Sequence, residues 1–321
     1  MPGIPTTMRV AAMDRFGPPS VLKIREFPVP PIAANEVLIK VHTAGVGSWD
    51  PDIRGGWWPQ GKPKFPIILG SDGSGTVAAI GQRVRRFDVG DKVYGYAWMN
   101  SKGGFYAEYV AVAAENVALI PRKLDLRQGG AVPATGFTAL QGIDDHLKIK
   151  RGENIIVHSA SGRVGSLALQ FAKLRGARVL ATARGRDGIA LVKRLGADAS
   201  ADGKKENLAQ VARRFAPDGL DAIFATAGGK PLEQCIDALK PGGRLCYPNG
   251  VDPEPKKRKG IKVLTYDAIA GVHEFAKLTR AVEAAKLKAV IAVAFSLEDA
   301  AKAHERIEVG HVLGRIVLKI R

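Results

Sequence analysis

The sequence has few of the features that mark disulfide-bonded, membrane-spanning or secreted proteins. It holds two cysteines in 321 residues, Cys235 and Cys246, which excludes a disulfide framework and a zinc site made only of thiolates. No apolar run reaches the roughly 18 residues of a membrane-spanning helix. The N-terminal stretch MPGIPTTMRV lacks the basic and apolar blocks of a secretory signal. We therefore expect a protein of the reducing cytoplasm.

Acidic residues are scarce relative to basic ones. The chain has 48 Lys and Arg against 31 Asp and Glu, a formal net charge of +17. Such an excess favours an anionic ligand or nucleic acid, or it is spread over solvated faces. The basic residues are scattered, and their one dense cluster, KKRKGIK at 256–262, follows the loop-forming VDPEP. We interpret the cluster as a solvated loop, and we expect no specific nucleic-acid partner and no membrane association.

The order of local patterns predicts two domains, as the chain length also does. Up to residue 122, β-rich segments such as EVLIKVHTAGV alternate with turns rich in Gly and Pro, which indicates a mainly β domain. From residue 153, strand-like and helix-like segments alternate, which is typical of a parallel sheet with crossover helices. The last strand, GRIVLKI, is positioned to return to the sheet of the first domain.

Residues 155–186, IIVHSASGRVGSLALQFAKLRGARVLATARGR, form a strand–turn–helix–strand pattern. Their Ala160-x-Gly162-x-x-Gly165 spacing is a degenerate dinucleotide-binding motif. We expect Gly162 to let the backbone approach a pyrophosphate, and Gly165 to let the helix pack closely on the strand. The helix start would attract the anion. The alternative is a tight turn in a doubly wound protein that binds no ligand.

The end of the second strand distinguishes the two dinucleotides. A free ribose 2′-hydroxyl calls for Asp or Glu there, whereas a 2′-phosphate calls for Arg or Lys. The chain reads Thr182-Ala183-Arg184-Gly185-Arg186, without an acid and with two guanidinium groups. We therefore predict NADP(H). Asp187, expected at the N-cap or in the first turn of the next helix, argues for NAD. Arg163 is either a further phosphate contact or a solvated residue.

Segments from about Met8 to the C-terminus resemble the medium-chain dehydrogenase/reductase superfamily, and more closely its zinc-free quinone oxidoreductase (zeta-crystallin-like) branch. The resemblance rests on AGVGSWDPDIRGG (44–56), FPIILGSDGSGTVAAIG (65–81), DVGDKVYGY (88–96), GGAVPATGFTAL (129–140), HSASGRVGSLALQFAKLRGARVLAT (158–182), LKPGGRL (239–245) and GHVLGRIVL (310–318). It implies an α/β fold, in which a GroES-like, mainly β catalytic domain spans 1–122 and 263–321. A doubly wound Rossmann domain at 123–262 would bind NADP, and the chain would form a homodimer.

The zinc alcohol dehydrogenases of this superfamily differ from the chain at two positions. They place Cys where Gly47 stands and His where Ser71 stands, in a motif that here reads Gly70-Ser71-Asp72. A catalytic zinc takes about three N, S or O ligands from the protein. The six histidines are dispersed without metal-like pairing. We predict no metal.

The resemblance also implies cofactor positions, residue by residue. Around the pyrophosphate these are Ala160, Ser161, Gly162, Arg163 and Val164. The other expected positions are Gly47, Thr138, Thr182, Ala183, Arg184 and Arg186, together with five residues that follow predicted strands, Thr226, Ala227, Tyr247, Asn249 and Gly250.

The candidates for the substrate pocket lie in the first domain: Ser48, Asp50, Asp72 and Tyr96. Loop closure or turn capping is the alternative for Asp50, Asp72 and Tyr96. The family commonly shows Asn where Gly47 stands, so a hydrogen bond to substrate or ribose is missing here. Trp57 and Trp58 either wall the pocket or pack under a loop. No side chain stands out as a general acid, so we name no catalytic residue, and solvent is a possible proton source.

Without a Lewis acid, the substrate must already accept hydride, as quinones and α,β-unsaturated carbonyls do. The resemblance implies NADPH-dependent reduction of such an acceptor. Two alternatives stay open. One is an enoyl-thioester reductase of the same superfamily. The other is a low-turnover NADPH-binding protein with an RNA-binding or stress-structural role, for which the net charge of +17 is the motive.

Overall fold

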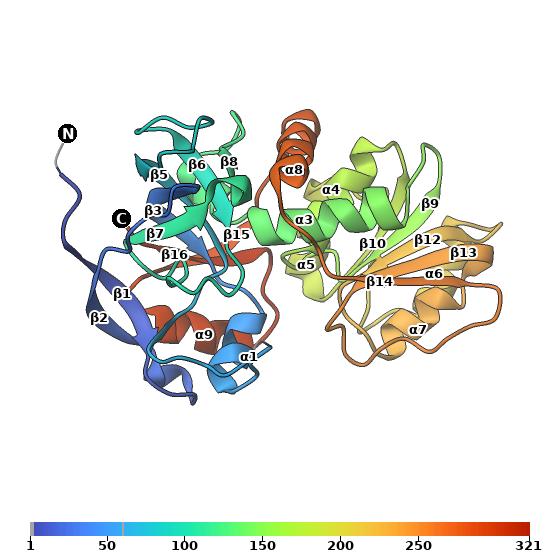
Figure 1. The fold of residues 1–321 in the computed structure, drawn as a ribbon. Coiled ribbons are helices and arrows are strands. Elements are labelled where there is room, and N and C mark those ends of the chain that lie inside the picture. Colours follow the sequence, from blue (N-terminus) through green and yellow to red (C-terminus); the bar gives the residue numbers. More distant parts are fainter. Residues whose placement is uncertain (1–2, 60) are drawn as a thin grey trace. The chain divides into compact units, whose positions relative to one another are not determined.

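The computed structural model describes residues 3–59 and 61–321 (Figure 1). The chain divides into two compact units. The first contains the chain up to Ala134 together with Ala270–Thr279 and Ile291–Arg321, and the second contains Thr135–Ile269 and Arg280–Val290. The expected boundaries at 122/123 and 262/263 lie near these divisions without coinciding with them, and the assignment of domains stays a prediction.

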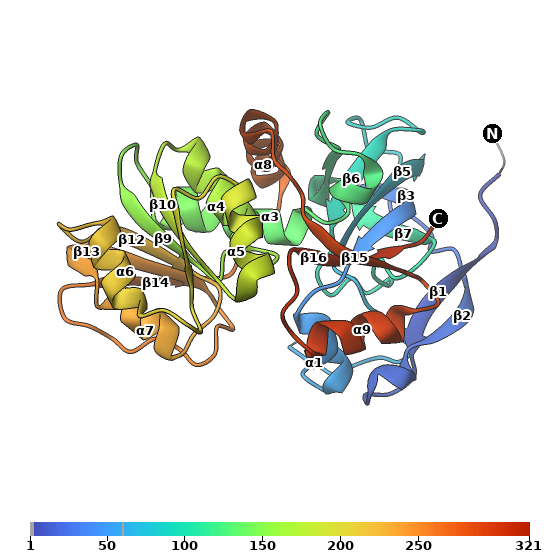
Figure 2. The ribbon, with the colours of Figure 1, turned by 180° about the vertical axis from the view of Figure 1, so that it is seen from behind.

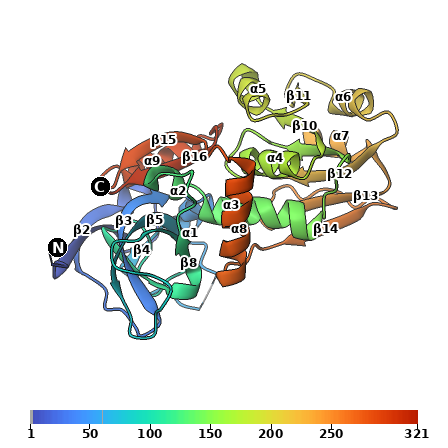
Figure 3. The same ribbon diagram turned by 90° about the horizontal axis from the view of Figure 1, so that it is seen from above.

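Two sheets organise the described part of the first unit. The larger has the order β15-β16-β3-β5-β6-β8, with β7 pairing to β3 off this path. The smaller has the order β2-β1-β4. The C-terminal strand β16 pairs antiparallel with β3, which confirms the predicted return to this sheet, and β15 lies beside it at one edge (Figure 3). The strands are β1 (Thr7–Met13), β2 (Lys23–Pro28), β3 (Glu36–Gly45), β4 (Ile67–Ile68), β5 (Asp72–Ile80), β6 (Lys92–Tyr96), β7 (Tyr109–Ala113), β8 (Val117–Leu119), β15 (Ile291–Ser296) and β16 (Arg315–Lys319).

Both faces of β3 are packed, since neighbouring side chains of a strand point to opposite faces. Val37 and Ile39 belong to the main core of the first unit, together with residues of β6, β7 and β16. Leu38, between them, packs with Met8 and other β1 residues in a second cluster. The near-continuous apolar run of β3 thus reflects burial on two sides.

Short helices complete the first unit. They are η1 (Pro19–Val21), α1 (Trp49–Gly55), η2 (Ala114–Asn116), α2 (Leu126–Gly129) and α9 (Ala300–Glu308). The division between the units falls within α3 (Pro133–Gln141) and α8 (Val272–Ala285).

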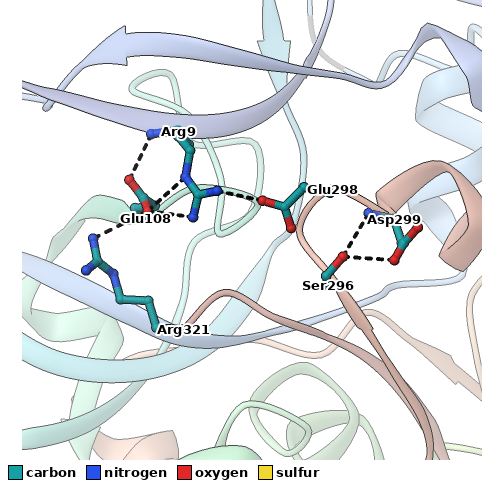
Figure 4. Close-up of polar contacts among 6 residues, drawn as sticks. All are labelled: Arg9, Glu108, Ser296, Glu298, Asp299 and Arg321. Carbon is teal, nitrogen blue, oxygen red and sulfur yellow. Dashed lines mark hydrogen bonds and ion pairs between the residues drawn. The ribbon is translucent and has the colours of Figure 1, made fainter.

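An ion-pair network joins the N-terminal strand of the first unit to its C-terminus (Figure 4). The Arg9 guanidinium contacts Glu108 at 3.1 Å and Glu298 at 2.7 Å, and Arg321 contacts Glu108 at 3.5 Å. Beside it, the Ser296 hydroxyl donates to Asp299 at 2.9 Å, just before α9. The Arg9 and Arg321 side chains are 51% and 39% exposed, so each of these ion pairs adds little stability on its own.

The second unit is a parallel sheet of order β11-β10-β9-β12-β13-β14. In chain order this is 3-2-1-4-5-6, the order of a Rossmann sheet, so the predicted α/β class is confirmed. The helix α4 covers one face, and α6 and α7 cover the other (Figure 2). The strands are β9 (Asn154–His158), β10 (Arg178–Ala183), β11 (Ala199–Asp202), β12 (Leu220–Ala225), β13 (Leu239–Pro248) and β14 (Lys262–Tyr266). The helices are η3 (Gly142–His146), α4 (Gly165–Leu174), α5 (Gly185–Arg194), α6 (Leu208–Phe215) and α7 (Lys230–Ile236).

Candidate active site

The turn between β9 and α4 has the geometry expected of a dinucleotide cradle. The Gly162 amide donates to the Ser159 carbonyl at 3.2 Å. A Cβ on Gly165 would lie 2.4 Å from that carbonyl oxygen, so only glycine lets α4 begin this close to β9. A Cβ on Gly162 would meet the same oxygen at 3.4 Å, an ordinary contact. Packing within the chain therefore requires Gly165 to be glycine, whereas at Gly162 it leaves room for an approaching ligand.

The remaining residues of the turn lead directly into α4. Ala160 and Ser161 are buried, and the Ala160 amide donates to the Thr182 carbonyl of β10 at 2.8 Å. Arg163 and Val164 are half-buried, and the cap residue Val164 makes no side-chain hydrogen bond to the helix start. A negatively charged group at this helix end would meet the positive end of the helix dipole.

The end of β10 carries no acid at the position that would hold a free ribose hydroxyl. Thr182 and Ala183 are buried there, and the Thr182 hydroxyl lies 2.8 Å from His158 Nδ1. Burial lowers the pKa of His158 to about 4, so this histidine is neutral near pH 7 and its contacts are structural. Arg184 and Arg186 are exposed.

Two acidic residues near Arg184 and Arg186 accept hydrogen bonds from backbone amides. Asp187 lies in the first turn of α5, one of the two expected places, where its carboxylate accepts from the Gly188 amide at 2.8 Å. Asp202, at the end of β11, was not singled out from the sequence. Its carboxylate accepts from the amides of Gly185 and Lys204, at 3.2 and 3.0 Å.

The other cofactor positions of the second unit lie on three elements. Thr226 and Ala227 directly follow β12, as expected, and the Thr226 hydroxyl donates to the His158 carbonyl at 3.4 Å. Tyr247 was expected after a strand but lies within β13, because that strand continues to Pro248. Asn249 and Gly250 follow β13, and Thr138 lies in α3.

The sheet order brings most of these residues to one edge. The strands β9, β10, β12 and β13 are parallel, so their carboxyl ends meet at the same side of the sheet. The chain order reverses between the neighbours β9 and β12. In open α/β sheets, ligands bind outside the carboxyl ends of the strands at such a reversal. The cradle after β9 and the pair Thr226–Ala227 after β12 flank it.

In the first unit, Asp50 closes the loop that precedes α1. One of its carboxylate oxygens accepts from the Gly47 amide at 2.8 Å and from the Tyr106 hydroxyl at 2.9 Å. His304 Nε2 lies 3.2 Å from the same hydroxyl. Burial raises the pKa of Asp50 to about 7, although both hydrogen bonds oppose the rise. Tyr106 and His304 were not found from the sequence, since they lie far from Asp50 along the chain.

Asp72 forms a buried ion pair. Arg315 of β16 donates to one of its oxygens at 2.5 Å, and the Ala134 amide donates to the other at 3.0 Å. Burial raises the pKa of Asp72, and Arg315 opposes that rise. Tyr96 stands opposite Asp72 in the β5–β6 register, and Ser48 is the half-buried N-cap residue of α1.

Gly47 and Ser71, which stand where the zinc alcohol dehydrogenases place Cys and His, both lie next to the indole ring of Trp49. A Cβ on Gly47 would lie 2.5 Å from Cε2 of Trp49, and Trp49 Nε1 donates to the Ser71 hydroxyl at 2.7 Å. Trp57 lies near Trp98, with ring centroids 6.5 Å apart, whereas Trp58 packs against Phe16. Trp49 and Trp98 were not singled out from the sequence. For Trp49, the glycine two positions earlier was the available signal.

No group of three or more His, Cys, Asp or Glu that could hold a metal ion occurs within residues 3–59 and 61–321. The absence of a metal stays a prediction. None of the helices in the described ranges is long and apolar enough to cross a membrane.

Family models match both parts of the chain. Residues 33–122 match the model described as the alcohol dehydrogenase GroES-like domain. Residues 195–318 match the model described as zinc-binding dehydrogenase. The second description fits the fold, whereas Gly47 and Ser71 supply neither thiolate nor imidazole.

Individual proteins match over nearly the whole chain. Quinone oxidoreductase of Mus musculus is 32% identical over 314 residues, covering 94% of each chain. The NADPH-dependent alkenal/one oxidoreductase of Arabidopsis thaliana is 29% identical, covering 98% of this chain and 80% of its own. A solved NAD-dependent alcohol dehydrogenase is 30% identical with a TM-score of 0.90, covering 98% of this chain and all of its own.

These matches agree with the fold and with the motifs that carry the resemblance. They confirm the expected family and the expected class of enzyme. The chain belongs to the medium-chain dehydrogenase/reductase superfamily, alongside its quinone oxidoreductases, and is a pyridine-nucleotide-dependent oxidoreductase.

Proposed function

We propose that this protein transfers hydride from NADPH to a quinone or another α,β-unsaturated carbonyl acceptor without a metal. The observation that carries the proposal is the cradle after β9, where Gly165 is required by packing and Gly162 leaves room for a ligand. The names of the mouse and Arabidopsis relatives support the acceptor class.

The preference for NADPH over NADH rests on the end of β10. Thr182 and Ala183 offer no carboxylate for a ribose hydroxyl, and Arg184 and Arg186 are exposed beside them. A guanidinium pairs with phosphate through both charge and geometry. The acid of α5, Asp187, holds its own helix start. The 2′-phosphate of NADPH therefore has partners here that the 2′-hydroxyl of NADH lacks.

On the substrate side, the protein has to orient the hydride acceptor. The cofactor, when bound, supplies a hydride. Neither Gly47 nor Ser71 brings a soft metal ligand, and the Ser71 hydroxyl already accepts from Trp49. An acceptor whose conjugation delocalises negative charge onto oxygen needs positioning and hydrogen bonds to that oxygen. We assign Ser48 and Tyr96, both half-buried, to the substrate side, with Asp50 and Asp72 holding the loops behind them.

The test is an acceptor panel. Purified protein is mixed with NADPH and with 1,2-quinones, 1,4-quinones, enones or enoyl thioesters, and the loss of reduced-nicotinamide absorbance is followed. We expect oxidation with quinones or enones. Clear NADPH binding without oxidation by any acceptor would refute the proposed enzyme activity and favour a low-turnover NADPH-binding protein. Turnover only with enoyl thioesters would favour an enoyl-thioester reductase. The homodimer and the cytoplasmic location stay predictions.

A further inference from the structure

Trp98 lies close to two tryptophans from the far earlier segment around α1, Trp49 and Trp57. The Trp49 and Trp98 rings meet edge to face, with centroids 5.5 Å apart and an interplanar angle of 80°. Trp98 and Trp57 are tilted, with centroids 6.5 Å apart. We call Trp49, Trp98 and Trp57 the tryptophan stack. Its centroid separations fall in the range of favourable aromatic pairs.

Ser71 holds two sides of the stack in place. Its hydroxyl accepts from Trp49 Nε1 at 2.7 Å, and its carbonyl accepts from the Ala97 amide, next to Trp98, at 2.7 Å. On the third side, Gly56 has a positive φ of 120°, and the Trp57 amide donates back to the Asp52 carbonyl at 2.9 Å. A side-chain hydrogen bond thus holds the Trp49 ring, and main-chain hydrogen bonds hold the backbone at Trp57 and next to Trp98.

Gly47 makes the position of Trp49 possible. A Cβ at residue 47 would lie 2.5 to 2.9 Å from three atoms of the indole ring, so a larger residue there and this indole cannot coexist. The side chain missing at Gly47 is therefore replaced in space by an aromatic surface. Gly47 and Trp49 form a matched pair.

The stack lies at the end of the sheet that carries the substrate candidates. Gly47 follows the end of β3, Ser71 precedes β5, and the two strands pair antiparallel through Ala44 and Gly73. Tyr96 ends β6 opposite Asp72, and Trp98 comes two residues later. Trp49 and Trp98 are half-buried and pack against the core, whereas Trp57 is 53% exposed. The stack thus extends from the core of the first unit, at Trp49 and Trp98, to an exposed ring, Trp57.

We propose that the tryptophan stack binds the hydride acceptor, and that Trp49 and Trp98 make the enzyme prefer acceptors with a fused aromatic ring. This inference rests on the proposed function. The electron-rich face of an indole ring stacks favourably on an electron-poor, flat quinone. A small aliphatic enone lacks the ring area to use the stack. The matched pair Gly47–Trp49 is then a specificity determinant.

The test compares 1,4-naphthoquinone with 1,4-benzoquinone, which share the reacting ring and differ by one fused ring. We expect Trp98→Leu and Trp49→Leu to lower kcat/KM for naphthoquinone about five-fold, the effect of one lost aromatic pair. For benzoquinone the change should stay within about two-fold, and the dissociation constant of NADPH should not move. The matched control is Trp58→Leu, outside the stack, which should leave the ratio of the two kcat/KM values unchanged.

A double-mutant cycle gives a second route. Gly47→Asn should displace the indole and lower the naphthoquinone preference as Trp49→Leu does. Added to Trp49→Leu, it should have no further effect on that preference, because the displaced ring is already gone. Equal losses with both quinones in all three single variants, or additive effects in the cycle, would overturn the inference while leaving the proposed function intact.

Binding to the unmodified protein separates the two proposals. Equilibrium dialysis should show that naphthalene-2,3-diol binds and that cyclohexane-1,2-diol binds at least five-fold more weakly. Absence of turnover with either quinone would refute the proposed function but not this binding. Equal binding of the two diols would refute the stack as an aromatic site, even where both quinones are reduced.

Discussion

At the scale of single residues, Gly162 and Gly165 of the cradle are glycine for different reasons. Gly165 is required by the Ser159 carbonyl, whose oxygen would lie only 2.4 Å from a Cβ at residue 165, whereas Gly162 has space within the chain. The motif alone predicts both glycines but cannot separate packing from ligand approach. The separation depends on distances between backbone atoms on either side of the turn.

We predict opposite consequences for the two alanine variants. Gly165→Ala should lower the free energy of unfolding by about 1–3 kcal/mol through overpacking. Gly162→Ala should fold normally and weaken NADPH binding about ten-fold or more, since its methyl group would occupy the approach of the pyrophosphate. Urea unfolding and NADPH titration of each variant check this. A Gly162→Ala variant that binds NADPH as the unmodified protein does would contradict the assigned role.

Asp50 gives a prediction in pH. Burial raises its pKa from 3.8 to about 7, so the folded state binds this proton more tightly than the unfolded state does. The contribution of Asp50 to stability therefore declines as pH rises from about 4 to about 7. Asp50→Asn stays neutral and should lack the decline. The free energy of unfolding of both proteins is measured from about pH 4 to about pH 7, and with rising pH the unmodified protein should lose stability relative to Asp50→Asn. Parallel profiles would disprove the raised pKa of Asp50.

At the scale of elements, the strand–helix alternation and the returning C-terminal strand follow from local patterns. The residues that hold the first unit together do not. Asp50 and Tyr106 are 56 residues apart, and Tyr106 and His304 are 198 residues apart. Trp49 and Ser71 are 22 residues apart, with α1 and β4 between them. Such partners are fixed by sheet register, which local spacing does not reveal. Local spacing thus predicts the strand–turn–helix around Gly162 and Gly165, whereas it does not predict the contacts of the first unit.

The ion pair Asp72–Arg315 ties β5 to β16, and both side chains are almost completely buried. We predict that Arg315→Leu lowers stability by about 3–5 kcal/mol, because it leaves a buried carboxylate without its partner. The double variant Asp72→Asn/Arg315→Leu should recover much of the loss, since Asn keeps an acceptor for the Ala134 amide. Urea denaturation measures both. A double variant no more stable than Arg315→Leu would show that the strand needs the charge itself.

At the scale of the whole molecule, the net charge of +17 is compatible with an anionic ligand. The basic cluster lies in the loop between β13 and β14, as predicted, except for Lys262, which begins β14. Its Arg258 pairs with Glu233 of α7 at 2.7 Å. A positive surface also raises the local concentration of an anionic dinucleotide. The charge, the cradle and the family are consistent with one account, a reductase that draws its hydride from a phosphorylated nicotinamide cofactor.

The most direct test of this account is the ratio of kcat/KM for NADPH to that for NADH, measured with a single quinone acceptor. We predict a ratio well above one. In the double variant Arg184→Ala/Arg186→Ala the ratio should fall at least ten-fold, because kcat/KM for NADPH falls while that for NADH does not change. Each lost charge-assisted contact is worth roughly 1.5–3 kcal/mol. A preference for NADH, or a ratio unchanged by removing both arginines, would contradict it.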